Sequence, residues 1–187
     1  MCYMFEMKKT FFTSDSHFGH VNIIKYCNRP FKSVEEMDAK MIANWNEVVG
    51  QDDDVYHLGD FAMGKTAVPN VLARLNGNIH LIWGNHDSNQ VRGLSNWASS
   101  QPYLEINLDG HFIVLCHYKF DVFNKSHRGA IQLFGHSHGT MPGNNQQLDV
   151  GVDCWDFKPV DLQAILRRLK TLPDYRNKDY HGEGGSK

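Results

Sequence analysis

The sequence predicts an α/β sandwich, with sheet layers inside and helices outside. Strand-like and helical patterns alternate along the first half of the chain, the second half is rich in strands, and polar clusters follow the strands. A chain of 187 residues has the length of one domain with a substantial core. We find no repeat and no linker that would divide it, so we expect a single domain over residues 1–172.

The predicted strands share a short apolar or β-branched run that ends in a polar loop. They are residues 8–15, 53–60, 79–87, 130–139 and 147–155. The segment 103–119 reads as a hairpin, because two alternating strands flank Asp109-Gly110, a dipeptide typical of a tight turn.

The predicted helices share apolar residues at helical spacing, and they cover residues 33–50, 67–77 and 158–170. Ser33 and Glu36 form a capping-box pair at the start of the first helix. Pro69 is tolerated because it lies near the start of the second helix. Asp161 is the expected N-cap of the third helix. The apolar stripe of the first helix, which we interpret as core packing, is Val34, Met37, Met41, Trp45 and Val48.

The composition excludes several classes of protein. The net charge is −2 and no long basic run is present, so an extended nucleic-acid-binding surface is not expected. No apolar stretch is long enough to span a membrane, and the N-terminus lacks the features of a signal peptide. The four cysteines form no C-x-x-C pair, which favours free thiols in a reducing, cytoplasmic location. The polar, glycine-rich segment 173–187 is predicted to be a disordered tail.

Five of the predicted strands end in aspartate, histidine or asparagine residues. The segments are SDSH (14–17), LGD (58–60), WGNHD (83–87), LCHY (115–118) and FGHSH (134–138). A lone histidine on a strand is more often a core residue than a ligand, but five such endings in succession favour convergence at one sheet edge. Imidazole and carboxylate groups together suit transition metals.

The set provides seven metal-ligand residues, namely Asp15, His17, Asp60, Asn85, His117, His136 and His138. If one carboxylate bridges two ions, each ion reaches four protein ligands and keeps positions for water and substrate. Asp15 and His17 are two residues apart, so on an extended strand they would face the same way. Gly135 and Gly139 flank the last two histidines and would allow close approach of the backbone.

The ordered pattern D-x-H, G-D, G-N-H-D, H and G-H-x-H, over residues 15–138, resembles that of the calcineurin-like metallophosphoesterase superfamily. The opening SDSHFGHVNIIKYCNRPF looks like a small bacterial and bacteriophage branch. The resemblance implies a four-layer α/β/β/α sandwich and two divalent transition-metal ions, with Mn²⁺ first and Fe, Zn or Ni as alternatives. Cys116 departs from the pattern, since the superfamily often has glycine at that position.

The resemblance also implies individual roles. Asp15, His17, Asp60 and His138 would hold the first ion, and Asp60, Asn85, His117 and His136 would hold the second. His86 would assist the leaving group while a metal-bound hydroxide attacks phosphorus, and Asp87 would orient His86 by accepting its other ring N–H. All seven ligands and His86 are present, so a non-catalytic scaffold is not favoured.

Residues 59–66, GDFAMGKT, match the phosphate-binding loop pattern G-x-x-x-x-G-K-[ST]. Such a loop holds an anion with backbone N–H groups, whereas Asp60 would face the phosphates with negative charge. Phe61 and Met63 also add bulk. We therefore interpret Asp60 as a metal ligand and the G-K-T match as coincidental, with a nucleotide triphosphatase as the alternative.

The substrate is expected to be a small phosphate ester, because the chain has no capping domain and no basic stripe. We expect a nucleotide-like phosphodiester ahead of a phosphomonoester. The candidate substrate-binding residues are His20, Asn22, Arg29 and Tyr118, and a surface position for Arg29 is an equal alternative. No membrane partner is expected, and a homodimer stays open.

Overall fold

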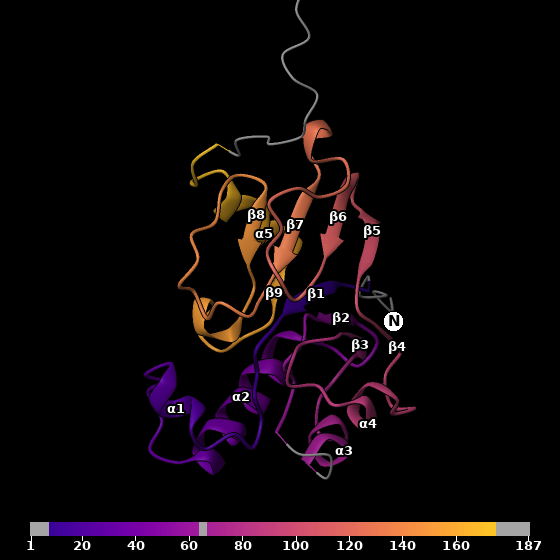
Figure 1. The fold of residues 1–187 in the computed structure, drawn as a ribbon. Coiled ribbons are helices and arrows are strands. Elements are labelled where there is room, and N and C mark those ends of the chain that lie inside the picture. The colour runs from indigo at the N-terminus through magenta and orange to yellow at the C-terminus, as the bar shows by residue number, and fades with distance from the viewer. Residues whose placement is uncertain (1–7, 64–66, 175–187) are drawn as a thin grey trace, which may run out of the picture.

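The chain folds into two β-sheets with helices packed around them (Figure 1). This computed structural model describes residues 8–63 and 67–174. Gly64, Lys65 and Thr66 lie outside the described residues, and so does the predicted tail from residue 175 on. The first two tail residues are described, and both bond to Asn145. Asn145 donates its backbone N–H to the Pro173 carbonyl at 2.8 Å and its side-chain amide to Asp174 at 2.9 Å.

The first sheet has the strand order β4-β3-β2-β1-β9. Its strands are β1 (Thr10–Thr13), β2 (Asp54–His57), β3 (Asn78–Ile82), β4 (Ser99–Gln101) and β9 (Val160–Asp161). Strands β1 to β4 run parallel, and β9 pairs antiparallel with β1. The carboxyl ends of the parallel strands therefore lie at one edge, which is where ligands bind in such sheets.

Four helices accompany the loops between these strands, in the lower part of Figure 1. They are α1 (Ile23–Tyr26), α2 (Val34–Val48), α3 (Ala67–Leu72) and α4 (Asn89–Arg92). Phe11, Val55 and Ile79 form one row across the sheet and share a buried cluster with Met41 and Trp45 of α2. The predicted stripe of the first helix is therefore core packing.

The second sheet has the order β5-β6-β7-β8. Its strands are β5 (Leu104–Leu108), β6 (His111–Leu115), β7 (Ile131–Phe134) and β8 (Gln147–Asp149). Strands β5 and β6 form the predicted hairpin, and β6, β7 and β8 run parallel. Asp109 and Gly110 have φ values of 49° and 80°, which fit the tight turn that their sequence predicts.

The two sheets share an apolar core, in which Phe12 of β1 and Leu58, directly after β2, belong to one buried cluster with Leu115 of β6 and Leu133 of β7. Helix α5 (Leu162–Leu169) contributes Ile165 and Leu169 to this core and contacts β1, β8 and β9. It therefore joins the two sheets at one side, and it lies behind β7 and β8 in Figure 1.

The outer face of the second sheet is covered by residues 116–130, which include the short 3₁₀ helix η1 (Ser126–Arg128). Phe123 and Ala130 pack on Val114 there. Gln132 fixes the same segment by accepting the Phe120 N–H at 3.0 Å and donating to the Tyr118 carbonyl at 2.9 Å. The predicted α/β sandwich of sheets flanked by helices is confirmed, although a loop covers much of this face.

The predicted elements are present but shorter than expected. The second helix ends at Leu72 and not at residue 77, because Asn76 is tied to α2 by the Trp45 indole N–H at 3.0 Å and by the Asn46 side chain at 2.9 Å. The prediction missed α1, α4 and β4, and it placed the two residues of β9 inside the last helix. Among residues 8–63 and 67–174, no helix is long and apolar enough to cross a membrane.

Candidate metal centre and catalytic site

The loops after β1 and β2 are joined by backbone hydrogen bonds at one edge of the first sheet. The Asp15 N–H donates to the Gly59 carbonyl and the His17 N–H to the Asp60 carbonyl, both at 3.0 Å. The loops after β6 and β7 are joined in the same way, since the Gly135 N–H donates to the His117 carbonyl at 3.0 Å. These bonds fix the loops on which the predicted ligands lie.

The first group of ligand atoms comes from Asp15, His17 and His138, all within 4.8 Å of one another. The Nε2 atom of His17 is buried and has no hydrogen-bond partner. A buried polar atom without a partner is rare in proteins, so this nitrogen fits a metal ligand. Asp15 and His17 do not lie on an extended strand, however, because β1 ends at Thr13 and their φ values are 58° and 52°.

The second group comes from Asp60, His117 and His136, also within 4.8 Å of one another. Asn85 lies beside it, with its side-chain oxygen 3.1 Å from His117 Nε2. The predicted amide ligand is therefore close to this group.

One carboxylate oxygen lies between the two groups. Asp60 Oδ2 is 3.6 Å from His17 Nε2 and 3.5 Å from His117 Nε2. The other oxygen, Oδ1, accepts the backbone N–H of His86 at 2.8 Å, which orients the carboxylate. Asp60 therefore has the position that a bridging ligand requires.

Two histidines have one ring nitrogen fixed by the protein. His138 Nδ1 lies 2.7 Å from Asp153 Oδ2, and His117 Nδ1 lies 2.7 Å from the Leu58 carbonyl oxygen. Because both partners are acceptors, each Nδ1 carries a proton, and Nε2 is the ring nitrogen that can bind a metal ion. This arrangement is typical of metal-binding histidines. Sequence reasoning missed Asp153, because nothing in its local sequence indicates a contact with His138.

Five of the predicted ligands have a left-handed backbone. The positive φ values are 58° at Asp15, 52° at His17, 57° at Asp60, 66° at His136 and 47° at His138. Such conformations are uncommon for residues with a side chain, and they cluster at functional sites.

Two glycines allow the backbone of the cluster to come close. A Cβ atom on Gly84 would collide with the carboxylate and backbone N of Asp60, and one on Gly135 would collide with Ser14 and Asp15. The sequence predicted that Gly135 allows close approach of the backbone, and here the missing side chain makes room for the Asp15 carboxylate. The Asp15 carboxylate in turn accepts the His136 N–H at 2.9 Å.

Burial and neighbouring groups shift the pKa values of the side chains in the cluster. Burial raises the pKa of Asp15 to about 7 and lowers the pKa of His17 to about 3. Burial would also raise the pKa of Asp60, but His117, the His86 N–H and His17 outweigh it and hold that pKa below its usual range. Proximity of Asp60 and Asp15 raises the pKa of His117 despite burial. A bound cation would favour the charged carboxylates and the neutral histidines.

His86 and Asp87 do not form the predicted pair. The His86 ring lies 5.4 Å from the His17 ring and 6.4 Å from the His20 ring, measured between centroids. The buried Asp87 carboxylate accepts three backbone N–H groups, from Asp60 and Gly84 at 2.8 Å and from Phe61 at 3.0 Å. Asp87 therefore shapes the loop of Asp60, and the prediction that it orients His86 is wrong.

Arg29 is neither a surface residue nor free to bind a substrate. Its side chain is fully buried, and it holds both oxygens of Asp153 at 2.8 and 2.9 Å. It also donates to the carbonyls of Ser16 at 3.0 Å and Asp15 at 2.7 Å. The guanidinium thus positions the ligand loop and, through Asp153, His138.

The other predicted substrate residues lie at the rim. His20 is partly buried, and its Nδ1 atom has no hydrogen-bond partner. The exposed Tyr118 lies 4.9 Å from the His136 ring, and its hydroxyl is 3.5 Å from Asn85 Oδ1. Asn22 caps α1 and is exposed, with no side-chain hydrogen bond in that capping position.

The phosphate-loop interpretation of residues 59–66 does not fit the part of that segment that the structure describes. The N–H groups of Asp60 and Phe61 donate to Asp87, and the N–H of Met63 donates to the Phe18 carbonyl at 2.8 Å. These donors are directed into the protein and are not free for a phosphate. Gly64, Lys65 and Thr66, the match that we interpreted as coincidental, lie outside the described residues.

Comparison with known proteins gives relatives along most of the chain. No family model matches it. It is 34% identical over 174 residues to the uncharacterized protein MJ1445 of Methanocaldococcus jannaschii, covering 88% of this chain and 93% of that protein. It is 30% identical over 190 residues to the Gene 66 protein of Mycobacterium phage D29, covering 83% and 94%. Among solved structures, AQ665 of Aquifex aeolicus, a protein of unknown function, matches with a TM-score of 0.69 and 22% identity over 87% of this chain and 100% of that one.

The fold is a two-sheet α/β sandwich of the kind seen in AQ665, and that likeness is one of fold alone. The chain belongs to the family that includes MJ1445 and the Gene 66 protein of phage D29.

Proposed function

We propose that this protein is a phosphoesterase that depends on two divalent transition-metal ions. Mn²⁺ is the first choice, with Fe, Zn or Ni as alternatives. The observation that carries the proposal is the position of Asp60 Oδ2, 3.6 Å from His17 Nε2 and 3.5 Å from His117 Nε2. These two nitrogens belong to separate groups of ligand atoms, so one carboxylate oxygen faces both.

We assign one ion to Asp15, His17, Asp60 and His138, and the other to Asp60, Asn85, His117 and His136. The mixed nitrogen and oxygen donors suit first-row transition metals better than Ca²⁺ or Mg²⁺, which prefer oxygen. The fixed Nδ1 atoms of His117 and His138 support the assignment, because they leave Nε2 as the donor.

When bound, such a pair of ions supplies a nucleophile from water and clamps the attacking and leaving oxygens of a phosphoryl displacement. The protein's own contribution to proton transfer is assigned to His86. Its backbone N–H is bound to Asp60 Oδ1 at 2.8 Å, which fixes it relative to the carboxylate between the two groups. Its ring can donate a proton to the leaving oxygen while the seven ligand residues hold the ions.

The rim favours a nucleotide-like phosphodiester over a monoester. The side chains of Tyr26 and Tyr118 are 74% and 44% exposed, and they lie against His20 and His136 respectively. Aromatic faces are platforms for bases, and a diester carries an organic group on each side of phosphorus. Arg29 is occupied by Asp153 and two carbonyls, so it does not neutralise the second negative charge of a monoester.

The test is hydrolysis of bis(4-nitrophenyl) phosphate and 4-nitrophenyl phosphate by the Mn²⁺-loaded protein, with metal content measured in parallel. We expect the diester to have the higher kcat/KM. Asp60→Asn should bind fewer ions and lose activity by about 10²-fold or more, the scale at which metal-site groups act. Asp109→Asn, in the exposed hairpin turn, is the matched control. Metal-independent hydrolysis, or full activity of Asp60→Asn, would contradict the proposal.

We also propose a cytoplasmic location, as the scattered cysteines led us to expect.

A further inference from the structure

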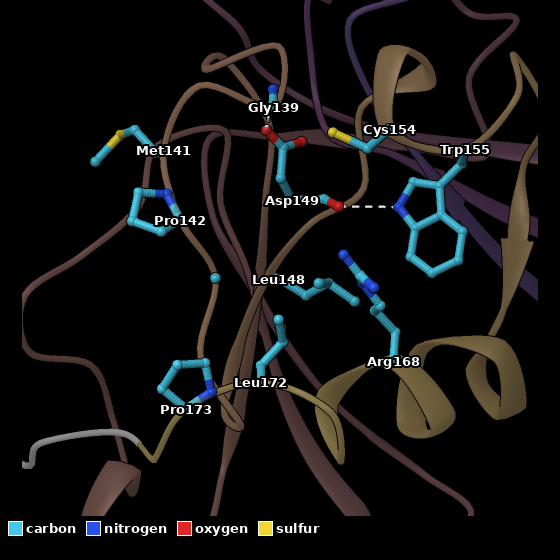
Figure 2. Close-up of a pocket in the computed structure, with 11 residues that line it drawn as sticks. Gly139, Met141, Pro142, Leu148, Asp149, Cys154, Trp155, Arg168, Leu172 and Pro173 are labelled. Carbon is cyan, nitrogen blue, oxygen red and sulfur yellow. Dashed lines mark hydrogen bonds between the residues drawn. The ribbon is translucent and has the colours of Figure 1, made fainter.

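A cavity lies next to the loop that carries His138 (Figure 2). Its volume is about 610 Å³, within the range of small-molecule sites. The walls come from the segment after β7, from β8, from the end of η2 (Val152–Cys154) with the residue after it, and from α5 and its C-terminal extension. None of the seven predicted metal ligands lines it, so it is separate from the candidate metal centre.

The walls of this cavity are mainly apolar and one of them is flat. Pro142, Leu148, Leu172 and Pro173 supply aliphatic surface. The Trp155 indole lines one side, and its N–H donates to the Asp149 carbonyl at 2.9 Å, shown by the dashed line in Figure 2. Because this bond fixes the ring, the cavity presents a preformed flat surface to an occupant.

One cation points into the cavity. The Arg168 side chain extends from α5 toward Leu148 and Trp155 (Figure 2). Within the described part of the chain, its guanidinium makes no ion pair or hydrogen bond with an acidic side chain. The acidic residue in the wall, Asp149, is already occupied, because it accepts from Ser137 Oγ at 2.6 Å, Gly139 N at 3.0 Å and Gly151 N at 2.7 Å.

We propose that this cavity binds a small organic anion. Its flat apolar body would lie against Trp155 and Leu148, and its carboxylate, sulfonate or phosphate group would bind the Arg168 guanidinium, which matches such groups in geometry and charge. The anion site does not depend on the proposed phosphoesterase activity, whereas its link to the metal centre rests on the proposed role of His138 as a metal ligand.

The cavity is connected to the candidate metal centre by two chain neighbours. Gly139 and Cys154 line it, and they directly follow His138 and Asp153. Those two residues are joined at 2.7 Å between Nδ1 and Oδ2. An occupant that shifts either wall residue therefore shifts this pair, and binding in the cavity should change the affinity of the His138 group for metal, and the reverse.

The test uses 8-anilinonaphthalene-1-sulfonate as the probe, with its fluorescence titrated against the full-length protein. Arg168→Ala should weaken binding by about 10-fold or more, the scale of one hydrogen bond to a charged group. Arg167→Ala is the matched control, since Arg167 is exposed on the same helix and does not line the cavity. N-phenyl-1-naphthylamine, which lacks the sulfonate, should bind equally to the wild type and to Arg168→Ala.

Two results would overturn the proposed anion site, and a third would overturn its link to His138. Equal affinity of the wild type and Arg168→Ala for the sulfonate probe would remove the anion site. Much tighter probe binding after removal of residues 175–187 would assign the cavity to the C-terminal segment. Equal Mn²⁺ affinity in isothermal titrations with and without saturating probe would overturn the link to His138, for which we expect a change of about threefold or more.

Discussion

His86 is positioned by its backbone and not by a carboxylate on its ring. Its N–H is bound to Asp60 Oδ1, while its ring lies close to His17 and His20. The backbone of His86 is therefore fixed to the carboxylate between the two ligand groups, and its ring nitrogens stay available for the proposed proton transfer. The proposed proton transfer by His86 is therefore separate from the proposed metal binding, and each can be tested without the other.

His86→Ala should lower kcat by about 10²–10⁴-fold, the usual contribution of a general acid or base. Mn²⁺ content should stay unchanged. The loss should be smaller for a nitrophenolate leaving group, which needs little protonation, than for an alkoxide. The measurement is kcat on an aryl and an alkyl diester, with His111→Ala in the hairpin as control. Loss of an ion, or an equal loss of rate for both esters, would contradict the assignment.

His57 gives the metal-free protein a pH-dependent stability. It is buried against Trp45 and Phe61, and its Nε2 lies 2.8 Å from Ser16 Oγ. Burial lowers its pKa to about 3, whereas an unfolded histidine titrates near 6.5. Between these values the unfolded chain binds the proton and the folded chain does not. Stability is therefore full above about pH 6.5 and falls as the pH drops toward 3.

Replacement of His57 by Gln should flatten this dependence. One proton contributes about 1.4 kcal/mol per pH unit, so the slope of the unfolding free energy between about pH 4 and 6 should fall by about that amount. The measurement is urea denaturation of metal-free protein across that range. An unchanged slope would mean that His57 is not neutral in the folded state. His80→Gln, at a partly exposed histidine on β3, is the control.

The turn at Asp109 and Gly110 determines how strands β5 and β6 pair in the hairpin. Asp109 and Gly110 have φ values of 49° and 80°, and a Cβ on Gly110 would meet no atom within 4 Å. Gly110→Ala therefore tests backbone strain alone. We expect a loss of about 1–2 kcal/mol in unfolding free energy, the penalty for an L-residue in this region, with hydrolysis unchanged. Asp109→Asn should be near neutral, and equal stabilities of the two variants would contradict the turn assignment.

Elements with a strong local signal were predicted, and those without one were missed. The capping serine of α2 accepts the Glu36 N–H as expected, although the Glu36 carboxylate accepts from Lys32 and not from Ser33. Strands β1 and β3 were predicted because each contains apolar or β-branched residues and ends in a polar loop. The missed helices have four residues each, and β4 has three polar residues. These segments are too short to show a helical or strand-like periodicity.

The candidate ligands were found because side chains of one chemistry recur at strand ends. The roles of Asp87 and Arg29 were not found, because they depend on which backbone groups lie near them. The Asp87 carboxylate serves N–H groups of residues 60, 61 and 84, and Arg29 bonds across 124 positions to Asp153. A local sequence pattern does not contain such contacts.

At the scale of the whole molecule, Arg29 connects the first ligand loop to the segment after β8. It binds the Asp15 and Ser16 carbonyls on one side and both oxygens of Asp153 on the other. Asp153 in turn binds His138 Nδ1 at 2.7 Å. Two candidate ligands of the same group, Asp15 and His138, are therefore held together by one buried cation from a third part of the chain.

Arg29→Lys should separate this structural role from the substrate role that the sequence suggested. A lysine ammonium keeps the charge but does not reproduce the fork that reaches Asp153 and two carbonyls. We expect a loss of about 2–4 kcal/mol in unfolding free energy, a large part of the stability of an ordinary domain. Mn²⁺ affinity should fall by about 10–100-fold, as for other residues that position metal ligands. At saturating Mn²⁺ the KM for the diester should stay near its wild-type value. Urea denaturation, Mn²⁺ titration and steady-state kinetics measure the three effects, with the exposed Arg74→Lys as control.

A raised KM in a protein of unchanged stability would instead make Arg29 a substrate ligand, and the buried ion pair would then have to open in solution.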